Sequence, residues 1–379
     1  MVGALAAIYA TRMLGLFLLL PVLAIYASGM PGATPTMVGV AMGAYGMAQA
    51  LLQIPFGRWS DRFGRRPLIV IGLVLFFAGS VVGALGKSLL VIILARSLQG
   101  AGAMSAAVTA LLADFTREAV RTRAMAFIGI SIGASFVVSL IAAPVLEALI
   151  GVSGIFWLMA LLAVMGLVLL RFAVPRHGEL EHPVGAQRAS LQHITLLVAL
   201  RPYFVGVFSL HFILTATFLS VPFVLLHRLN IAEVQHWKVY LGVFLSSFIG
   251  TVPLILAAER VARPQRIVVL AILVAALAQA TMALQHGIAW LVFTAFALFF
   301  AGFNFLEARM PAGLSRLVAA QDRGTAMGVF ATCQFLGAAG GGMIGGVALA
   351  HFGVTGVFWA SSLMALMWAA VVIGAPESN

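Results

Sequence analysis

The chain has 379 residues, of which 63% are hydrophobic and only 9% are charged, and its mean hydropathy is +1.11. Because soluble domains carry about 25% charged residues, this composition excludes an ordinary soluble protein and predicts a chain embedded in lipid. The net charge of +11 does not indicate a nucleic-acid-binding protein, since the cationic residues lie mostly in short turns and form no stripe interleaved with aromatic side chains.

Apolar windows of about 20 residues predict twelve transmembrane helices. We therefore predict an all-α integral membrane protein made of two six-helix bundles. The N-terminal bundle covers residues 1–175, the linker 176–201, where apolarity falls, and the C-terminal bundle 202–379. In chain order the predicted helices cover residues 4–28, 35–58, 67–86, 89–113, 121–149, 152–174, 202–227, 237–258, 265–285, 288–314, 322–349 and 353–375.

The charges of the turns predict the orientation of the chain. Most of the 22 cationic residues follow even-numbered predicted helices, whereas the turns after odd-numbered helices hold only Lys87, Arg228 and Lys238. Because cytoplasmic turns are enriched in lysine and arginine, we predict that both termini and the linker are cytoplasmic. The predicted location is the bacterial inner membrane, with many spans.

A charged turn recurs in the two halves of the chain. GRWSDRFGRRPLIV at 57–70 lies between two apolar stretches, and ERVARPQRIV at 259–268 is a weaker copy that aligns Asp61 with Glu259. RTRAMAFIG at 121–129 similarly resembles DRGTAMGVF at 322–330. A turn that recurs near the same place in each half predicts a duplicated bundle, which is the organisation of rocker-type secondary transporters.

These motifs resemble the major facilitator superfamily. The segment 57–69 is similar to its loop signature G-x-x-x-D-R-x-G-R-R/K, and RSLQGAG at 96–102 is similar to its fourth-helix motif. The resemblance implies the major facilitator fold and proton-coupled transport by alternating access. The segments that resemble the YajR-type branch of the drug:proton antiporters are RMLGLFLLLPVL at 12–23, IPFGRWSDRFGRRPLIV at 54–70, DFTREAVRTRAMAFIG at 114–129, EVQHWKVYL at 233–241 and FNFLEARMP at 303–311.

Export of small molecules is the direction that the resemblance favours. Gly129, Gly133 and Ala143-Pro144 look like a worn form of the Gly-Pro motif of drug:proton antiporters, with alanine in place of glycine before the proline. The alternative is a proton-coupled importer or facilitator of a small metabolite, for which an anion is one candidate. YajR-type proteins carry an added soluble C-terminal domain, which we expect to be absent here because the chain stops after the last predicted helix.

Other function classes fit the sequence less well. A membrane enzyme needs catalytic side chains clustered at one interface, and a channel would lack the paired charged turns. We see no nucleophile–base pair and no metal-ligand spacing, so we expect no enzymatic activity, no cofactor and no metal. The expected partners are a small-molecule substrate, protons and membrane lipid, without nucleic acid, and we expect a monomer.

The first charged turn is predicted to act as a cytoplasmic latch. The resemblance implies that Asp61 meets the positive end of the helix that begins near Asp322 and holds the outward-facing state. The alternative is charge that only sets topology, which requires the arginines but not Asp61. The predicted latch comprises Gly57, Asp61, Arg62, Gly64, Arg65, Arg66, Asp114, Glu118 and Arg121.

Glu307 and His211 are the predicted proton-coupling residues. They lie at a similar depth in their helices, as does Arg12, and a charge at bilayer depth costs roughly 2.5–3.5 kcal/mol on the insertion scale, so it should face the bundle interior. Histidine changes charge between pH 5 and 8, which makes His211 a suitable partner for Glu307. A neutral, structurally packed His211 and a snorkelling Arg12 are the alternatives.

Further polar residues predict a substrate cavity, because the first, fourth, seventh and tenth helices line the cavity in the superfamily that the chain resembles. No acidic residue accompanies Arg12 in the first helix, which favours an anionic substrate or a structural ion pair. Polar packing between helices explains the glutamines equally well. The predicted cavity residues are Arg12, Tyr45, Gln49, Gln53, Arg96, Gln99, Asn304 and Gln334.

Overall fold

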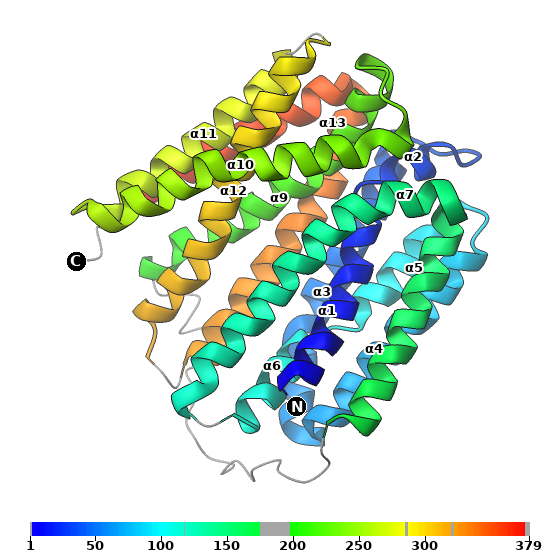
Figure 1. Cartoon of the computed structure of the whole chain (residues 1–379), viewed down its shortest axis with the longest axis vertical. Coiled ribbons are helices and arrows are strands. Elements are labelled where there is room, and N and C mark those ends of the chain that lie inside the picture. The colour runs from blue at the N-terminus through cyan, green and yellow to red at the C-terminus, as the bar shows by residue number, and fades with distance from the viewer. Residues whose placement is uncertain (1, 117, 175–197, 285–286, 320–321, 376–379) are drawn as a thin grey trace. The chain divides into compact units, whose positions relative to one another are not determined.

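The computed structural model describes residues 2–116, 118–174, 198–284, 287–319 and 322–375. These residues form helices joined by short turns and include no strand (Figure 1). The first group of helices is α1 (Val2–Leu18), α2 (Leu23–Ser28), α3 (Pro35–Phe63), α4 (Arg65–Leu85), α5 (Leu89–Ala101), α6 (Ser105–Asp114) and α7 (Glu118–Phe172). The second is η1 (Val198–Leu200), α9 (Arg201–Phe223), η2 (Val224–Arg228), η3 (Glu233–Gln235), α10 (His236–Arg260), α11 (Pro264–Leu284), α12 (Ala289–Leu317) and α13 (Arg323–Ile373).

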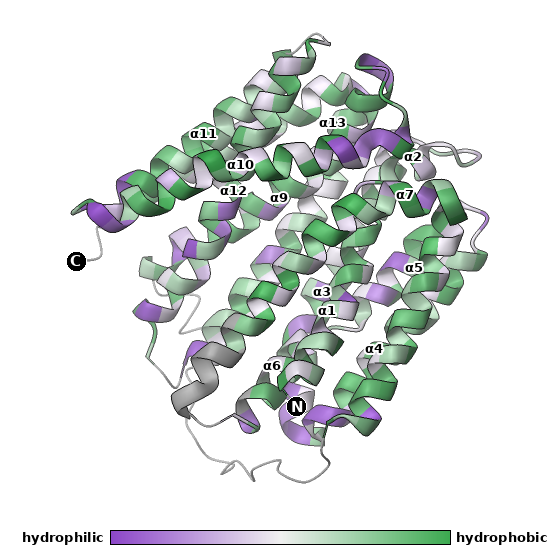
Figure 2. Ribbon diagram, in the orientation of Figure 1, coloured by the Kyte–Doolittle hydropathy of each residue, from purple (hydrophilic) through white to green (hydrophobic). Residues whose placement is uncertain are grey.

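The helices are apolar along most of their length. Among the described residues, nine helical stretches are long and apolar enough to cross a membrane, and Figure 2 shows hydrophilic residues mainly toward helix ends. A helix satisfies its backbone hydrogen bonds internally, which lipid requires because it offers no hydrogen-bond partners. The prediction of an all-helical, multi-pass membrane protein is therefore confirmed for the described part of the chain.

Two predicted helices are broken. The window 4–28 divides into α1 and α2 around Pro21, which lacks a backbone N–H and clashes with the preceding helical turn. The window 89–113 divides into α5 and α6 around Gly102, whose ψ of 51° is not helical. Gly102 lies so close to the carbonyl oxygen of Gly72 that a methyl group would overlap it, so the break allows a tight approach to α4.

Two other helices are much longer than one predicted span. α7 has 55 residues and α13 has 51, and each contains one glycine with a positive φ, Gly151 at 68° and Gly353 at 63°. This region of backbone conformation is open to glycine but strained for other residues. Gly151 lies in the turn that the sequence analysis predicted between 121–149 and 152–174, and Gly353 is the first residue of the last predicted helix.

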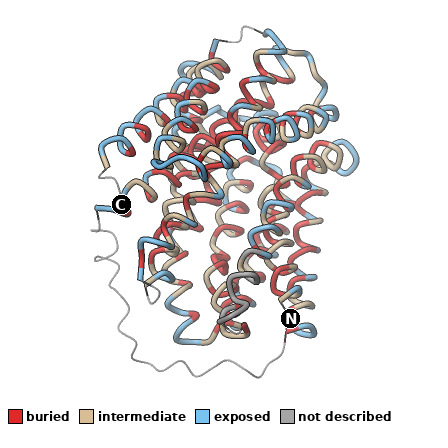
Figure 3. The backbone as a smooth tube through the Cα atoms, turned by 60° about the vertical axis from the view of Figure 1, so that its left-hand side comes forward, coloured by how far each residue is buried: buried red, intermediate tan, exposed pale blue. Residues whose placement is uncertain are grey.

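The described residues group into two compact units. Unit 1 draws on Met1–Pro31 and Ala44–Gln187, and unit 2 on Gly32–Gly43 and Arg188–Asn379. In unit 1, α1 and α4 both pack against α7, whereas in unit 2 α9 packs most extensively against α13. Buried and exposed residues alternate along most helices (Figure 3), as expected where one face meets neighbouring helices.

The α1–α7 and α9–α13 pairs are built alike. In unit 1, Ser135 Oγ donates to the Ala10 carbonyl over 3.2 Å, and Ser139 Oγ donates to the Leu14 carbonyl over 3.1 Å. In unit 2, two glycines of α13 lie against the equivalent carbonyls of α9, with Gly337 at Phe208 and Gly341 at Phe212. Small residues let helix backbones approach closely, and this approach places α13 side chains next to the polar residues of α9.

Candidate transport and coupling site

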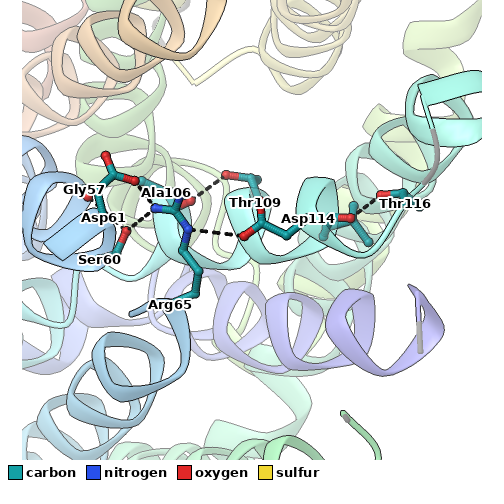
Figure 4. A network of polar contacts seen from close by, with 9 residues as sticks. Gly57, Ser60, Asp61, Arg65, Ala106, Thr109, Asp114 and Thr116 are labelled. Carbon is teal, nitrogen blue, oxygen red and sulfur yellow. Dashed lines mark hydrogen bonds and ion pairs between the residues drawn. The ribbon is translucent and has the colours of Figure 1, made fainter. Parts of the chain in front are cut away.

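Arg65 is the centre of the polar network at the first charged turn (Figure 4). Gly64, with φ at 93°, separates α3 from α4 and makes Arg65 the first residue of α4. The buried guanidinium contacts the Asp61 carboxylate through Nη1 and donates to Ser60 Oγ over 2.9 Å. Its Nε donates to Asp114 Oδ2 over 3.4 Å. Arg65 therefore links the end of α3 to the end of α6 through two carboxylates of unit 1.

The other predicted latch residues are placed differently. Arg66 donates from Nη1 to the Val174 carbonyl over 2.8 Å and from Nη2 to the Leu170 carbonyl over 2.7 Å. Arg66 thus donates hydrogen bonds to main-chain carbonyls at the C-terminal end of α7, where the helix dipole is negative. Arg62 is exposed beside the Phe63 ring, and a methyl group at Gly57 would make only an ordinary contact with Ala106. The side chains of Glu118 and Arg121 lie outside the described residues.

Arg12 is buried within unit 1, with 2% of its surface exposed. Its Nη2 donates to Gln49 Oε1 over 2.5 Å and to the Gly102 carbonyl over 2.9 Å, and its Nη1 donates to Ser105 Oγ over 3.2 Å. Gln49 in turn donates to Gln53 Oε1 over 2.9 Å. All these acceptors are neutral, and among the described residues Arg12 has no carboxylate within ion-pair distance.

Tyr45 contacts two guanidinium groups. Its ring centroid lies 5.8 Å from the guanidinium carbon of Arg12 and 4.9 Å from that of Arg96. Arg96 donates to Gln99 Oε1 over 2.9 Å, and Gln99 donates to Ser80 Oγ over the same distance. A desolvated cation–π contact contributes about 2 kcal/mol. Unit 1 therefore buries two guanidinium groups around one aromatic ring, and the hydrogen-bond acceptors that they have are neutral.

His211 lies at the centre of a second polar cluster, in unit 2. Its Nδ1 lies 3.1 Å from the Val207 carbonyl oxygen, and its Nε2 lies 2.7 Å from Gln334 Nε2 and 3.9 Å from Glu307 Oε2. The Phe303 ring meets the imidazole edge-on at 6.0 Å between centroids. The cluster thus joins α9, α12 and α13, and it brings together the two side chains predicted to exchange the proton.

Asn304 does not join the His211 cluster. Asn304 is a predicted cavity residue three positions before Glu307, but its Nδ2 donates to Ser247 Oγ of α10 over 3.1 Å. Three residues correspond to about 300° of helical rotation, so the two side chains diverge by about 60°. That angle is enough for Glu307 to face α9 while Asn304 faces α10.

Sequence reasoning missed some residues that hold Arg12. Gly102 and Ser105 accept two of its hydrogen bonds, and neither was predicted in the site. The available signal was GAGAMSA at 100–106, whose two glycines weaken a helix and so mark a place where carbonyls can leave the helical ladder. Among the described residues, no group of three or more His, Cys, Asp or Glu side chains could hold a metal.

A family comparison agrees with these observations. The family model of the Major Facilitator Superfamily matches residues 5–313. The chain belongs to the major facilitator superfamily. The inner membrane transport protein YajR of Escherichia coli (strain K12) is 40% identical to it over 369 residues, which make up 97% of this chain and 81% of that relative.

Two more distant similarities extend the comparison. Multidrug resistance protein 2 of Bacillus subtilis (strain 168) is 34% identical over 128 residues, covering 33% of this chain and 32% of that protein. The crystal structure of a bacterial homologue of the human lysosomal transporter Spinster, in an inward-facing and occupied conformation, matches with a TM-score of 0.75 at 14% identity. That match covers 98% of this chain and 95% of the other, and it shows a shared fold.

Membership of the major facilitator superfamily makes the protein a transporter, and transporters bind small-molecule substrates. The polar clusters around Arg12 and His211 are therefore candidate parts of a transport pathway. Polar and ionisable groups inside a membrane bundle are costly, and in transporters they mark substrate and ion pathways.

Proposed function

We propose that this superfamily member is a proton-coupled secondary transporter that exports small molecules by alternating access across a bacterial inner membrane. The observation that carries the proposal is the Glu307–His211 pair, 3.9 Å apart inside unit 2. A carboxylate and an imidazole at that distance can exchange a proton through a small side-chain rotation. The short match to a protein named for multidrug resistance supports the outward direction.

The proposed mechanism uses Glu307 as the proton carrier. Glu307 takes a proton from the outside when the site opens outward and releases it when the site opens to the cytoplasm. Substrate and proton occupy the site in turn, which makes the exchange an antiport. Such exchange needs the two conformational states to bind proton and substrate differently, since a ligand shifts an equilibrium only by its differential affinity.

Proteoliposome transport under an imposed pH gradient tests the proposal. The substrate would first be identified by thermal stabilisation across a compound panel at two pH values. Glu307→Gln keeps the shape of the carboxylic acid but cannot release a proton, so gradient-driven accumulation should disappear while substrate binding persists and depends less on pH. A Glu307→Gln protein that still concentrates substrate at the normal rate would place the coupling residue elsewhere.

Twelve transmembrane spans in two bundles form part of the proposal. At about 1.5 Å per residue, α7 and α13 would each be about 80 Å long if straight, far more than the hydrocarbon thickness of about 30 Å. The non-helical glycines Gly151 and Gly353 divide each of them into two spans. With α1 and α2 forming one span, and α5 and α6 another, the count reaches twelve.

We propose that the bundles cover residues 1–175 and 202–379, and that the linker 176–201 and both termini are cytoplasmic. The linker lies outside the described residues up to position 197. The charge of the turns supports this orientation, because the arginine-rich turn at 57–70 and its copy at 259–268 both follow even-numbered spans. We further propose that the protein works as a monomer surrounded by lipid.

The latch remains a proposal as well. Arg65 holds the carboxylate of Asp61 at the start of α4, and Asp61 itself is exposed. A carboxylate held in one orientation is suited to meet the positive N-terminus of another helix. The second carboxylate, Asp114, keeps Arg65 in place when the contact of Asp61 changes during the transport cycle.

Uptake of an anionic metabolite is the second candidate function. The observation in its favour is the pair of buried guanidinium groups, Arg12 and Arg96, which contact Tyr45 and have neutral hydrogen-bond acceptors. Among the described residues, the buried Nε atoms of both arginines have no hydrogen-bond acceptor, and an anion could supply one. Thermal stabilisation by carboxylates or phosphates that is lost in Arg12→Gln would favour this candidate, and stabilisation by cationic drugs would favour export.

A further inference from the structure

The contact at Nδ1 favours one of the two neutral tautomers of His211. Nδ1 lies 3.1 Å from the main-chain carbonyl oxygen of Val207, one turn earlier on α9. A carbonyl oxygen only accepts hydrogen bonds, so this contact favours the neutral tautomer that carries its hydrogen on Nδ1. Nε2 is then the nitrogen that gains and loses the proton.

Nε2 faces two side chains that favour opposite protonation states of this nitrogen. Gln334 Nε2 lies 2.7 Å away and is a donor, so it needs Nε2 of His211 to be bare. Glu307 Oε2 lies 3.9 Å away and, when ionised, is an acceptor that favours a hydrogen on the same nitrogen. In the neutral histidine the short contact to Gln334 therefore competes with the longer contact to Glu307.

The packing of α13 against α9 makes the Gln334 contact short. Gly337 lies one turn after Gln334 and rests directly on the carbonyl of Phe208, which is one turn before His211. His211 is 9% exposed, so water has little access to replace the amide. A glutamine side chain can also rotate by 180° and exchange its nitrogen for its oxygen with almost no change in shape.

The charged surroundings of His211 are simple within the described part of the chain. Glu307 of α12 is the described charged group within ion-pair distance. α13 presents the neutral Gln334, with Cys333 next to it in the chain, and α9 contributes the Val207 carbonyl. Arg309 follows two residues after Glu307 on α12, and among the ion pairs of the described residues none joins Arg309 to Glu307.

We infer that Gln334 is the positioning residue of the proton exchange, and this inference rests on the proposed coupling function of Glu307 and His211. While His211 is neutral, the amide donates to Nε2 and keeps it bare, ready to accept. When a proton leaves the carboxylic acid of Glu307, the lone pair of Nε2 takes it, leaving a carboxylate and an imidazolium. The side-chain amide of Gln334 then rotates by 180°, and its oxygen accepts a hydrogen bond from the new Nε2–H.

This reversal gives Gln334 a function that simple packing would not require. The amide holds neutral His211 as the Nδ1–H tautomer even when the nearby Glu307 is ionised. Without Gln334, an ionised Glu307 would draw a hydrogen onto Nε2, and that nitrogen could no longer accept the next proton. Loss of Gln334 should therefore uncouple proton exchange while leaving both titrating side chains in place.

Nitrogen-15 NMR of protein labelled at histidine and glutamine in lipid nanodiscs tests the inference without any substrate. The His211 signals are assigned by comparison with His211→Gln, and the Gln334 amide by comparison with Gln334→Leu. In the unmodified protein, Nδ1 should carry a hydrogen in both the neutral and the charged imidazole, whereas Nε2 should carry one only in the charged form. The side-chain amide signal of Gln334 should shift with the same midpoint.

A matched pair of variants sharpens the test. Gln334→Leu should convert more than half of the neutral His211 to the Nε2–H tautomer and lower gradient-driven transport at least tenfold. The control is Gln279→Leu, which removes a different buried glutamine that donates to Thr217 of α9 over 3.0 Å. In the control the His211 tautomer should be unchanged.

The outcomes separate the inference from the proposed function. Two results in the unmodified protein would overturn the role of Gln334, even if Gln334→Leu fails to fold. One is an unprotonated Nδ1 in neutral His211, and the other is a Gln334 amide signal that does not change when His211 is protonated. If either result is found while Glu307→Gln still abolishes gradient-driven transport, the role of Gln334 fails and proton coupling at Glu307 stands. If instead the NMR pattern is as expected and Glu307→Gln transports normally, the coupling function itself fails.

Discussion

Gly337 of α13 lies against the main-chain carbonyl oxygen of Phe208 in α9, so closely that a methyl group would overlap that oxygen. Gly341 repeats the contact one turn later at Phe212. In unit 1, Ser135 hydrogen-bonds to the equivalent carbonyl, that of Ala10. The two halves thus use the same close helix contact with different small residues, and in unit 2 the contact sets the distance between Gln334 and His211.

We predict that Gly341→Ala destabilises the protein, because the added methyl group must push α13 away from α9. Overpacking of this kind costs about 1–3 kcal/mol, so the midpoint of thermal unfolding in detergent should fall by several degrees. The control is Gly133→Ala, since a methyl group there meets no atom within 4 Å. Equal unfolding temperatures for the two variants would contradict the packing argument.

We predict that Asp61→Asn lowers transport without preventing insertion. The arginines still set the topology, but the charge that faces the proposed partner helix is gone. A loss of about 1–2 kcal/mol from the outward-facing state would change the ratio of states roughly 5- to 30-fold. Reporter cysteines placed on each side of the membrane, in a Cys333→Ala background, measure this ratio.

The matched control for the latch is Arg58→Gln, which also removes one charge from this end of α3. Arg58 is exposed, and the described partners of Arg65 are Ser60, Asp61 and Asp114 rather than Arg58. Its variant should keep the reporter accessibility of the unmodified protein. Unchanged accessibility and normal transport in Asp61→Asn would remove the latch from the proposal.

We predict that Arg12→Lys is not a conservative change. The guanidinium donates in three directions, to Gln49, Gly102 and Ser105, and an ammonium lacks this planar fork. Hydrogen bonds to charged groups contribute about 1.5–3 kcal/mol each, so the loss of one should lower both the unfolding temperature and transport. Arg171→Lys, at the exposed end of α7, is the control, and full activity of Arg12→Lys would contradict the prediction.

We predict that His211→Gln flattens the pH dependence of substrate binding on its acidic side. The imidazolium attracts the Glu307 carboxylate at acid pH, and glutamine carries no such charge. Substrate-induced thermal stabilisation measured from pH 5 to pH 8 reports the change. An identical profile in the variant would show that His211 is only a packed, neutral side chain.

Some properties of this protein could be predicted from short stretches of sequence. Uniform apolar windows require helices because lipid leaves backbone groups no other partners, and the charged turn around Gly64 marks the reversal between α3 and α4. Pro21 signals a break in its helix by local chemistry alone. These features depend on residues close together in the chain, and so the sequence states them directly.

The pairings inside the bundles needed the tertiary structure. His211 and Gln334 are 123 residues apart, and Arg12 and Gly102 are 90 residues apart. Which side chains meet depends on how far each helix is rotated about its axis and on where glycines permit close approach. Helical periodicity does not specify this, because even residues three apart, counted as one face, point in directions that differ by about 60°. The sequence by itself therefore determined a membrane-embedded helical protein and named its polar residues, whereas only the packing of α9 against α12 and α13 decided that His211, Glu307 and Gln334 form one cluster.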